Sequence, residues 1–376
     1  MRIALVTEFY YPHLGGVTEH VHNLAVQFQR AGHPTLVVTS HMAPPARGHD
    51  LSHDAADPPF VRRVGTSRTI YSAGSFARVT TGAGLRRKLR TLFREERIDV
   101  VHVHGGLNPT LGLVAPDAAG DLGVPVVATF HSWFAHSALC RIFRQPLQRR
   151  LDRHAAVLAV SQPVVNAHAR YFEADWEIIP NGVDTEFFHT GASPGPRLGE
   201  PELLFLGRLD PRNGLDTVLA AMPRVLERLP EARLTVAGDG PLRPVYERLA
   251  RPIGERVEFV GRVNGDRPGH YARADMYLCP TTTASFGITL LEAMACGTPL
   301  VVSDITGFRE LIGHGREAVL VPKDDPAAWA AAVVRLMADR RRLASMGLAG
   351  RRKAERYAWP RIAAQVMDVY RRVTTC

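Results

Sequence analysis

The sequence lacks the features of a membrane-spanning or disulfide-rich protein. Its four cysteines, Cys140, Cys279, Cys296 and Cys376, are far apart and form no Cys-x-x-Cys pair, so we expect reduced thiols and no metal site. No apolar run approaches the roughly 18–20 residues that span a bilayer. The first residues, MRIALVTEFYYPHLGG, hold one arginine and no small-residue cleavage site, which indicates a buried strand rather than a signal peptide. We therefore expect a cytoplasmic protein.

A dinucleotide-binding fingerprint is also missing. Gly238-Asp239-Gly240 follows an apolar run, but no third glycine and no well-placed acidic residue complete the pattern. An NAD-dependent enzyme is therefore disfavoured.

The charge balance is strongly basic, with a net charge of +9 and a pI near 9.8. Such a balance suits an anionic partner such as a phosphate group, nucleic acid or acidic lipid. A general preference for arginine over lysine would give the same balance. Since no nucleic-acid-binding motif is present, nucleic acid is not expected as a partner.

The order of apolar runs predicts an α/β protein. At about 100–200 residues per domain, 376 residues favour two domains. Apolar, β-branched runs alternate with helical patterns, which is typical of parallel sheets covered on both faces. The expected strands are 2–7, 35–40, 100–104, 126–130, 157–161, 203–207, 234–238, 257–261, 276–280, 300–303 and 318–321, and the expected helices include 214–229, 242–250, 327–337, 341–357 and 361–373.

A change of composition divides the chain. Residues 189–199 are rich in Gly, Pro and Ser and predict a linker. We expect an N-terminal Rossmann-like domain over 1–188, a second over 200–356, and a C-terminal helix over 357–376 that packs back on the first. Ligands of such sheets bind beyond the carboxyl ends of the strands, so the expected site is a cleft between two doubly wound domains.

Five short motifs follow one another in the second half. They are IPNGVD at 179–184, FLGRLDPRNGLD at 205–216, VAGDGPLR at 236–243, VEFVGRV at 257–263 and ASFGITLLEAMACGTPLVVSDITGFREL at 284–311. In this order they resemble glycosyltransferase family 4, whose members have the GT-B fold. The resemblance covers nearly the whole chain and implies a retaining transferase that uses a nucleoside diphosphate sugar, with no cofactor and no metal.

The residues around Gly287 carry the donor chemistry. Phe286-Gly287 predicts a turn and Ile288 the first residue of a helix, whose free N–H groups and dipole favour an anion such as the donor diphosphate. Arg208 would add a fork of donors to the same oxygens. The resemblance implies that His131 and Arg208 are catalytic and that Glu292 binds the donor ribose. The other donor-binding residues that it implies are Gly15, Gly16, Asn213, Gly238, Gly261, Val263, Ala284, Ser285, Phe286, Gly287, Ile288 and Thr289.

Two residues depart from the family pattern. Relatives usually have Glu where this chain has Ala284, and Lys where it has Asn213. Each missing charged hydrogen bond is worth about 1.5–3 kcal/mol, which lowers the rate without abolishing it. Arg212, beside Asn213, is a candidate substitute for the missing lysine.

The first half resembles the acceptor side of bacterial phosphatidylinositol mannosyltransferases. HLGGVTEHV at 13–21 matches their glycine loop, and AGSFARV at 73–79 matches a segment that contacts the lipid headgroup. Thr18 and Arg78 are the implied acceptor-binding residues, although Ala73 replaces the usual Asn. ATFHSW at 128–133 places His131 at a strand end, near the donor sugar in relatives. His102 and His104 share one strand face and either line the cleft or serve packing.

Arginines also decorate a helix near residue 90. Arg86, Arg87, Lys88, Arg90, Arg94 and Arg97 surround an apolar stripe of Leu85, Leu89, Leu92 and Phe93. This pattern fits a helix on an acidic membrane surface, peripheral on the inner face of the cell membrane, or a core-packed helix with a solvated face. Arg141, Arg144, Arg149 and Arg150 form a second basic stretch.

Three functions are therefore compared. The first is transfer of a hexose, with mannose favoured, from GDP-mannose or another nucleotide sugar to a phosphoinositide-like lipid or glycolipid. The second is a non-catalytic nucleotide-sugar-binding homologue or scaffold with a degraded donor site. The third is another GT-B enzyme, such as an epimerase or a phosphorylase, for which no pyridoxal-binding lysine motif is evident.

Overall fold

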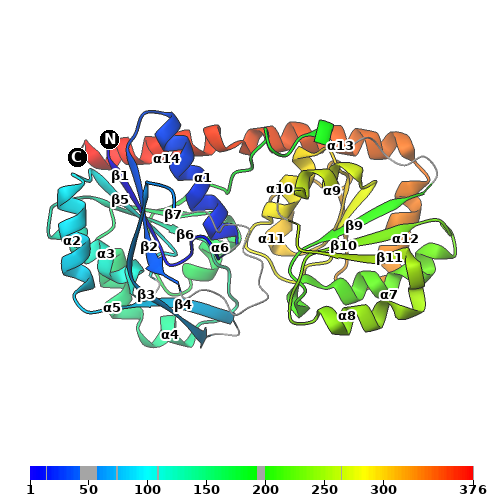
Figure 1. The fold of residues 1–376 in the computed structure, drawn as a ribbon, viewed down its shortest axis with the longest axis horizontal. Helices are drawn as coiled ribbons and strands as arrows, with labels where there is room; N and C mark the ends of the chain where they lie inside the picture. The colour runs from blue at the N-terminus through cyan, green and yellow to red at the C-terminus, as the bar shows by residue number, and fades with distance from the viewer. Residues whose placement is uncertain are drawn as a thin grey trace. The chain divides into compact units, whose positions relative to one another are not determined.

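The computed structural model describes residues 1–13, 15–42, 57–72, 75–107, 110–192, 200–263 and 265–375. The chain forms two compact units (Figure 1). Unit 1 comprises Met1–Asn181 and Trp359–Cys376, and unit 2 comprises Gly182–Ala358. The expected linker lies partly outside the described residues, at 193–199.

The first domain ends at Asn181 rather than at residue 188. The Val183 N–H donates to the Tyr357 carbonyl at 2.9 Å, and Val183 pairs with Ala358 in an isolated parallel bridge. Arg351 also donates to the Phe188 carbonyl at 2.9 Å. Residues 182–188 are therefore fastened to unit 2 by main-chain hydrogen bonds.

Unit 1 is built on an eight-stranded sheet of order β4-β3-β2-β1-β5-β6-β7-β8. Every neighbouring pair is parallel except β3 and β4. The strands are β1 (Ile3–Thr7), β2 (Thr35–His41), β3 (Val61–Ser72), β4 (Ser75–Thr81), β5 (Val100–His104), β6 (Val126–Phe130), β7 (Ala156–Ala159) and β8 (Trp176–Ile178).

The antiparallel pair β3–β4 corrects the expectation of a purely parallel sheet. Thr66 pairs with Thr81 and Ser72 with Ser75, so the described part of the segment that resembles a headgroup-binding motif lies on the edge strand β4. Ala73, the position of the missing asparagine, lies outside the described residues. The hairpin was missed because β3 carries three arginines in a polar run, whereas a strand covered on both faces is apolar.

Alternating strand residues bury the sheet of unit 1 on both faces. Ile3 and Leu5 pack with α1 (Gly16–Arg30) and α14 (Trp359–Thr374). Ala4 and Val6 pack on the other face with α2 (Leu85–Glu95) and α3 (Leu111–Gly120). Figure 1 shows α14 beside α1, and the rings of Phe28 and Tyr370 lie 5.5 Å apart. The shorter helices are α4 (Ala138–Ile142), α5 (Arg144–Leu151) and α6 (Gln162–His168).

A buried carboxylate fastens the sheet of unit 1 to α3. Glu8 follows β1 and is 1% exposed. It accepts hydrogen bonds from the Leu111 N–H at 2.7 Å, from the Thr110 hydroxyl at 3.1 Å and from the Thr80 hydroxyl. Burial raises the pKa of Glu8, while these donors oppose that change. The carboxylate thus joins the ends of β1 and β4 to the start of α3.

Unit 2 is a six-stranded parallel sheet of order β11-β10-β9-β12-β13-β14. Leu203 and Phe205 of β9 pack toward α7, α8 and α12. Leu204 and Tyr277 belong to the opposite face of the sheet. On that face the rings of Tyr271 and Tyr277 lie 5.3 Å apart. The strands are β9 (Glu202–Leu206), β10 (Arg233–Ala237), β11 (Val257–Gly261), β12 (Met276–Cys279), β13 (Leu300–Ser303) and β14 (Ala318–Val321). The helices are α7 (Leu215–Leu226), α8 (Arg243–Ala250), α9 (Arg267–Arg273), α10 (Ile288–Ala295), α11 (Thr306–Arg309), α12 (Pro326–Met337) and α13 (Arg340–Ala354).

Candidate functional site

The carboxyl ends of the unit 2 strands bring the predicted donor residues together. The Tyr277 hydroxyl of β12 donates to the Leu206 carbonyl at the end of β9, at 3.0 Å. The same hydroxyl is hydrogen-bonded by the side chain of Thr289, in the first turn of α10. Arg208, two residues beyond Leu206, therefore shares one edge of the sheet with the start of α10.

The N-terminus of α10 lies at this edge of the sheet. Gly287 precedes the helix with φ 105° and, as a glycine, offers no side chain to cap the first N–H groups. Ile288 and Thr289 are half-buried, while the helix is buried from Leu290 to Ala295. N–H groups at a helix start attract an anion, and binding of the donor diphosphate here stays a prediction.

Arg208 is free to reach such an anion. Its side chain is 60% exposed, and its nearest carboxylate is that of Asp210, with 3.8 Å between Nε and Oδ2. An exposed pair at this distance holds a side chain only weakly. The guanidinium is therefore not committed to the fold.

Asn213 has a definite structural role where relatives have lysine. Its amide nitrogen donates to the Arg208 carbonyl at 2.7 Å, and its amide oxygen accepts from the Thr281 hydroxyl at 3.4 Å. The side chain thus braces the main chain of Arg208 against the loop after β12. Ala284 is half-buried, and its carbonyl lies against Gly307, where an added Cβ would come within 2.0 Å.

Glu292 is buried, at 3% exposed, rather than solvent-facing. One carboxylate oxygen accepts from Arg267 of α9 at 2.7 Å and the other from the Tyr271 hydroxyl at 3.0 Å. The contact of Glu292 with the donor ribose stays a prediction. Arg267 was missed because its link to Glu292 joins two helices 25 residues apart, without a sequence signal.

The remaining donor residues of unit 2 lie on the same edge. Gly238 follows β10 with φ 139°, and its N–H donates to the Gly261 carbonyl at 2.6 Å. A Cβ on Gly238 would come within 1.9 Å of the Gly207 carbonyl oxygen, so the loops after β9 and β10 touch main chain to main chain. Val263 and Ser285 are half-buried, and Phe286 is buried beside Tyr357.

The glycine loop of unit 1 leads directly into α1. Gly15 has an extended conformation and precedes the helix, and both Gly15 and Gly16 are exposed. Thr18 was predicted to bind the acceptor, but it is fully buried and its hydroxyl donates to the His13 carbonyl at 2.7 Å. The geometry therefore assigns Thr18 to closing the glycine loop rather than to the acceptor.

Arg78 projects from the edge strand β4. It is half-buried, and its guanidinium donates to the Ser67 hydroxyl of β3 at 3.2 Å. Burial lowers the pKa of Arg78, yet the group stays a cation near neutral pH. The role of Arg78 in holding the acceptor phosphate stays a prediction.

His131 belongs to a cluster of four buried histidines. It follows β6 and contacts His104 of β5, with 3.1 Å between its Nε2 and Nδ1 of His104. His102 packs on His104 with ring centroids 4.1 Å apart, and it is hydrogen-bonded to Tyr370 and Thr129. The shared strand face of His102 and His104 is as predicted.

The fourth histidine, His20 of α1, was not predicted. Its ring centroid lies 4.8 Å from that of His131, and its Nδ1 lies 2.8 Å from the amide oxygen of Asn181. His20 stands inside the glycine-loop motif, but the contact with Asn181 spans 161 positions of the sequence. Only the folded sheet brings these groups together.

Burial keeps these rings neutral. It lowers the pKa of His20 to about 4, and lowers the pKa values of His102, His104 and His131 well below the usual 6.5. Neighbouring histidines add to the effect on His102, His104 and His131, because a second charge in the cluster would repel the first. Burial also lowers the pKa of His168, beside Phe130, to about 4.

The buried histidines predict a loss of stability in mild acid. The unfolded chain takes up protons near pH 6.5, whereas folded His20 and His168 do so only near pH 4. The unfolded state binds more protons between these values, so the free energy of unfolding falls as the pH falls from 6.5 toward 4. Each ring contributes up to about 1.4 kcal/mol per pH unit. Urea unfolding at pH 7.5, 6.0 and 5.0 measures this slope.

Carboxylates also change the free energy of unfolding as the pH falls. A matched pair of histidine variants separates the contribution of His168 from theirs. His168→Phe keeps an aromatic ring and should reduce the slope by about one proton. His136→Gln, at an exposed position, should leave the slope unchanged. Equal slopes in wild type and His168→Phe would contradict a neutral buried His168.

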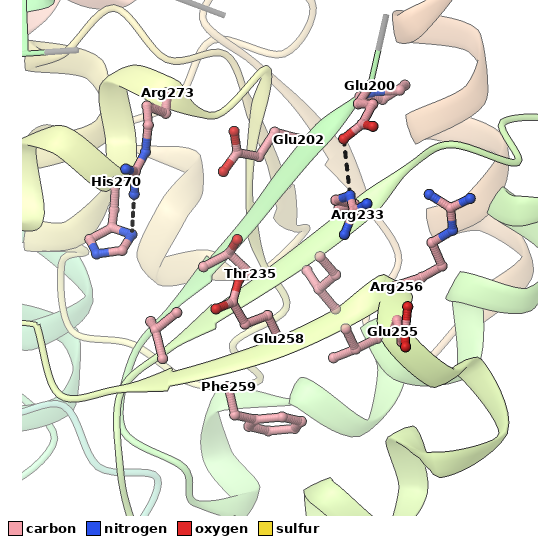
Figure 2. Close-up of a pocket in the computed structure, with 14 residues that line it drawn as sticks. Glu200, Glu202, Arg233, Thr235, Glu255, Arg256, Glu258, Phe259, His270 and Arg273 are labelled. Atoms are coloured by element: carbon pink, nitrogen blue, oxygen red, sulfur yellow. Dashed lines mark hydrogen bonds and ion pairs between the residues drawn. The ribbon is translucent and has the colours of Figure 1, made fainter. Parts of the chain in front are cut away.

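A cavity of about 590 Å³ in unit 2 lies away from this edge (Figure 2). It is lined by Glu202 and Arg233, the first residues of β9 and β10, and by Val257–Val260 of β11. Charges of both signs surround it, with Glu200 and Arg233 paired at 3.0 Å. Since Arg208 and the start of α10 lie at the opposite ends of the strands, this cavity is not the predicted donor site.

Comparisons with known proteins agree with this architecture. Residues 14–187 match the family described as "Glycosyltransferase Family 4", and residues 200–339 match "Glycosyl transferases group 1". The phosphatidyl-myo-inositol mannosyltransferase of Mycolicibacterium smegmatis is 33% identical over all of this chain and 94% of the relative. The GDP-mannose-dependent alpha-(1-6)-phosphatidylinositol monomannoside mannosyltransferase of Mycobacterium tuberculosis is 30% identical over 98% of both chains.

Solved structures share the fold. Sucrose-phosphate synthase from Thermosynechococcus elongatus gives a TM-score of 0.73 at 22% identity, over 100% of this chain and 99% of that one. The Anabaena protein HepE, solved in complex with UDP, gives 0.76 at 20% identity, over 98% of this chain and 99% of that one. Two Rossmann-like units with parallel sheets, matched over their full length, define the GT-B fold of glycosyltransferases. The chain belongs to glycosyltransferase family 4.

Proposed function

We propose that the chain is a retaining hexosyltransferase that moves mannose from GDP-mannose to a phosphoinositide-like lipid or glycolipid. The observation that carries the proposal is the end-to-end similarity to phosphatidyl-myo-inositol mannosyltransferases. The N–H groups at the start of α10 and the exposed Arg208 supply the matching chemistry for a diphosphate donor. Other nucleoside diphosphate hexoses are the alternative donors.

The donor diphosphate would be held by unit 2. As the bond between sugar and diphosphate breaks, negative charge grows on the leaving oxygens. The N–H groups at the start of α10 and the guanidinium of Arg208 would stabilise that charge. These positive groups neutralise the diphosphate without a resident metal ion. Glu292, oriented by Arg267 and Tyr271, would accept hydrogen bonds from the ribose hydroxyls.

The sugar would be oriented from unit 1. His131 is 9% exposed and neutral, so it can accept or donate one hydrogen bond to a sugar hydroxyl. The acceptor hydroxyl would attack from the face of the leaving group, which retains the anomeric configuration. No covalent nucleophile is assigned.

The acceptor would bring the protein to an acidic membrane surface. Arg78 would hold the acceptor phosphate. On α2, Arg87, Lys88 and Arg94 are exposed, whereas Arg86 and Arg90 are paired with Asp121. On α4 and next to it, Leu139, Ile142 and Phe143 are at least half exposed, with arginines on either side. Exposed apolar groups among cations favour a peripheral position on the cytoplasmic face. Within the described residues no helix is long and apolar enough to cross a bilayer.

The direct test is transfer by the purified full-length chain. Labelled GDP-mannose, UDP-glucose and ADP-glucose would each be incubated with phosphatidylinositol vesicles, and the products separated and their anomeric configuration determined. We expect transfer from GDP-mannose with retention. Absence of both transfer and donor hydrolysis with all three nucleotide sugars would overturn the proposal.

The second candidate, a non-catalytic homologue, rests on Ala284 and Asn213. Ala284→Glu would restore a carboxylate and should raise kcat/KM about tenfold, since a charged hydrogen bond is worth about 1.5–3 kcal/mol. Ala284→Gln is the uncharged control and should gain less. Asn213→Lys should not exceed wild type, because it removes the brace on Arg208. An inert wild type combined with an active Ala284→Glu would favour the scaffold.

A further inference from the structure

Three of the buried histidines converge on one point in unit 1. His20 belongs to α1, His104 ends β5 and His131 follows β6. One ring nitrogen of each lies within 4.8 Å of the other two, and all three side chains are buried. The rings also contact one another, with centroids of His20 and His104 5.3 Å apart and those of His104 and His131 5.4 Å apart.

The hydrogen bond from His20 to Asn181 leaves a lone pair on the other ring nitrogen. An amide oxygen only accepts hydrogen bonds, so Nδ1 of His20 donates its proton to Asn181. The other nitrogen, Nε2, therefore carries a lone pair. It is buried and has no hydrogen-bond partner in the described part of the chain. A metal-bound histidine usually donates its second N–H to a carbonyl or carboxylate oxygen in this way.

His104 presents a second unsatisfied nitrogen. Its Nδ1 is engaged with His131 at 3.1 Å, while its Nε2 is buried without a partner among the described residues. If His104 donates in the bond to His131, its Nε2 carries a lone pair like that of His20, and a metal ion would have to replace this bond to reach the lone pair of His131. Two unpartnered nitrogens in one buried cluster are costly unless a further group binds them.

We propose that His20, His104 and His131 form a binding site for one divalent metal ion of the zinc type. Imidazole nitrogens suit Zn²⁺ and Co²⁺, whereas Mg²⁺ and Ca²⁺ require oxygen ligands. Three histidines and one water complete a tetrahedral zinc site. At zinc–nitrogen distances of about 2.0–2.1 Å the ligand atoms lie roughly 3.3 Å apart, so separations of up to 4.8 Å must shorten by up to about 1.5 Å to bind the ion.

The surroundings support ligation. His102 packs against His104 and is itself held by Tyr370 and Thr129, which limits the rotation of the cluster. Trp359 of α14 covers His20, with ring centroids 5.3 Å apart.

The site would regulate transfer, a consequence that depends on the proposed function. His131 is the residue assigned to orient the donor sugar. A metal ion bound to its ring would remove that hydrogen bond, so zinc should inhibit the transferase. Binding itself does not depend on the activity, so the two ideas can fail separately.

The test is metal binding by the full-length chain after treatment with a chelator. Titration with Co²⁺ should give one tightly bound ion per chain and the visible absorption of a tetrahedral cobalt site, and Zn²⁺ should displace it. His20→Gln and His104→Gln should each weaken binding at least tenfold. The control His136→Gln changes an exposed histidine and should bind as wild type does.

The outcomes separate the alternatives. Binding that persists in His20→Gln, or a wild type that binds no ion tightly, would overturn the site. If a glutamine variant unfolds, the metal-induced rise in the melting temperature of wild type, absent with Mg²⁺, still decides the question. One tight ion in a chain that transfers no sugar would retain the site and reject the proposed function. Zinc inhibition that is lost in His20→Gln would support both.

Discussion

Arg208→Ala is expected to lower kcat/KM for sugar transfer by about a hundred- to a thousandfold. Loss of one donor aimed at a developing negative charge has an effect of this size, equivalent to about 2.7–4 kcal/mol. Most of the effect should appear in kcat, because the charge on the leaving diphosphate grows in the transition state. Initial rates over a range of GDP-mannose concentrations measure both constants.

Two controls make the Arg208 result specific. The side chain is 60% exposed, so its removal should leave the melting temperature nearly unchanged. Arg228→Ala removes another exposed arginine of unit 2 and should change the rate less than twofold. A rise in KM with unchanged kcat would contradict a role for Arg208 in stabilising the transition state. It would mean that Arg208 binds the donor equally well in the ground state and the transition state.

Gly238→Ala is expected to destabilise unit 2 by about 3–5 kcal/mol. Its φ of 139° is rarely adopted by residues with a side chain, and the new Cβ would come within 1.9 Å of the Gly207 carbonyl oxygen. The main chain after β9 or β10 would have to move, which also displaces Arg208. Hydrogen exchange should show faster opening of unit 2 peptides, while those of unit 1 keep their protection.

Two other glycines of unit 2 separate the two causes of the expected destabilisation, which are backbone strain and the close contact of the new Cβ. Gly254 also has a positive φ, 67°, but nothing lies within 4 Å of an added Cβ, so Gly254→Ala tests backbone strain alone and should cost about 1 kcal/mol. Gly265 has an open environment and no positive φ, so Gly265→Ala should be nearly neutral. If Gly238→Ala is as stable as Gly254→Ala, this result would contradict the close contact between the new Cβ and the Gly207 carbonyl oxygen.

The sequence predicted those parts of the fold whose signals are local. Apolar runs located eleven strands within one or two residues, and the break at Trp359-Pro360 located the start of α14. The sequence did not predict β8, which has three residues, or the pair β3 and β4, whose residues near the sheet edge are polar and charged. The division at Asn181 was missed because the pairing of Val183 with Ala358 joins distant parts of the chain.

In the candidate site, too, the sequence predicted local features but not contacts between distant residues. Motifs located Arg208, Gly238 and the start of α10, whose geometry depends on a few neighbouring residues. They gave no indication that Glu292 is buried against Arg267 or that Thr18 is held by His13. The histidine cluster needs contacts such as that of His102 with Tyr370, which spans 268 positions. Such pairs are defined by topology rather than by spacing.

The return of α14 to unit 1 has a consequence for biosynthesis. Unit 2 is inserted within the sequence of unit 1, so the ribosome completes residues 182–358 before it makes the helix that covers Ile3 and Leu5. At about 5–20 residues per second, that face of the first sheet has α1 but not α14 to cover it for roughly 10–35 seconds. Unit 2 can fold as soon as it emerges, whereas unit 1 and its histidine cluster are completed only when Tyr370 leaves the ribosome. The nascent chain is therefore expected to need chaperone protection at its N-terminal half.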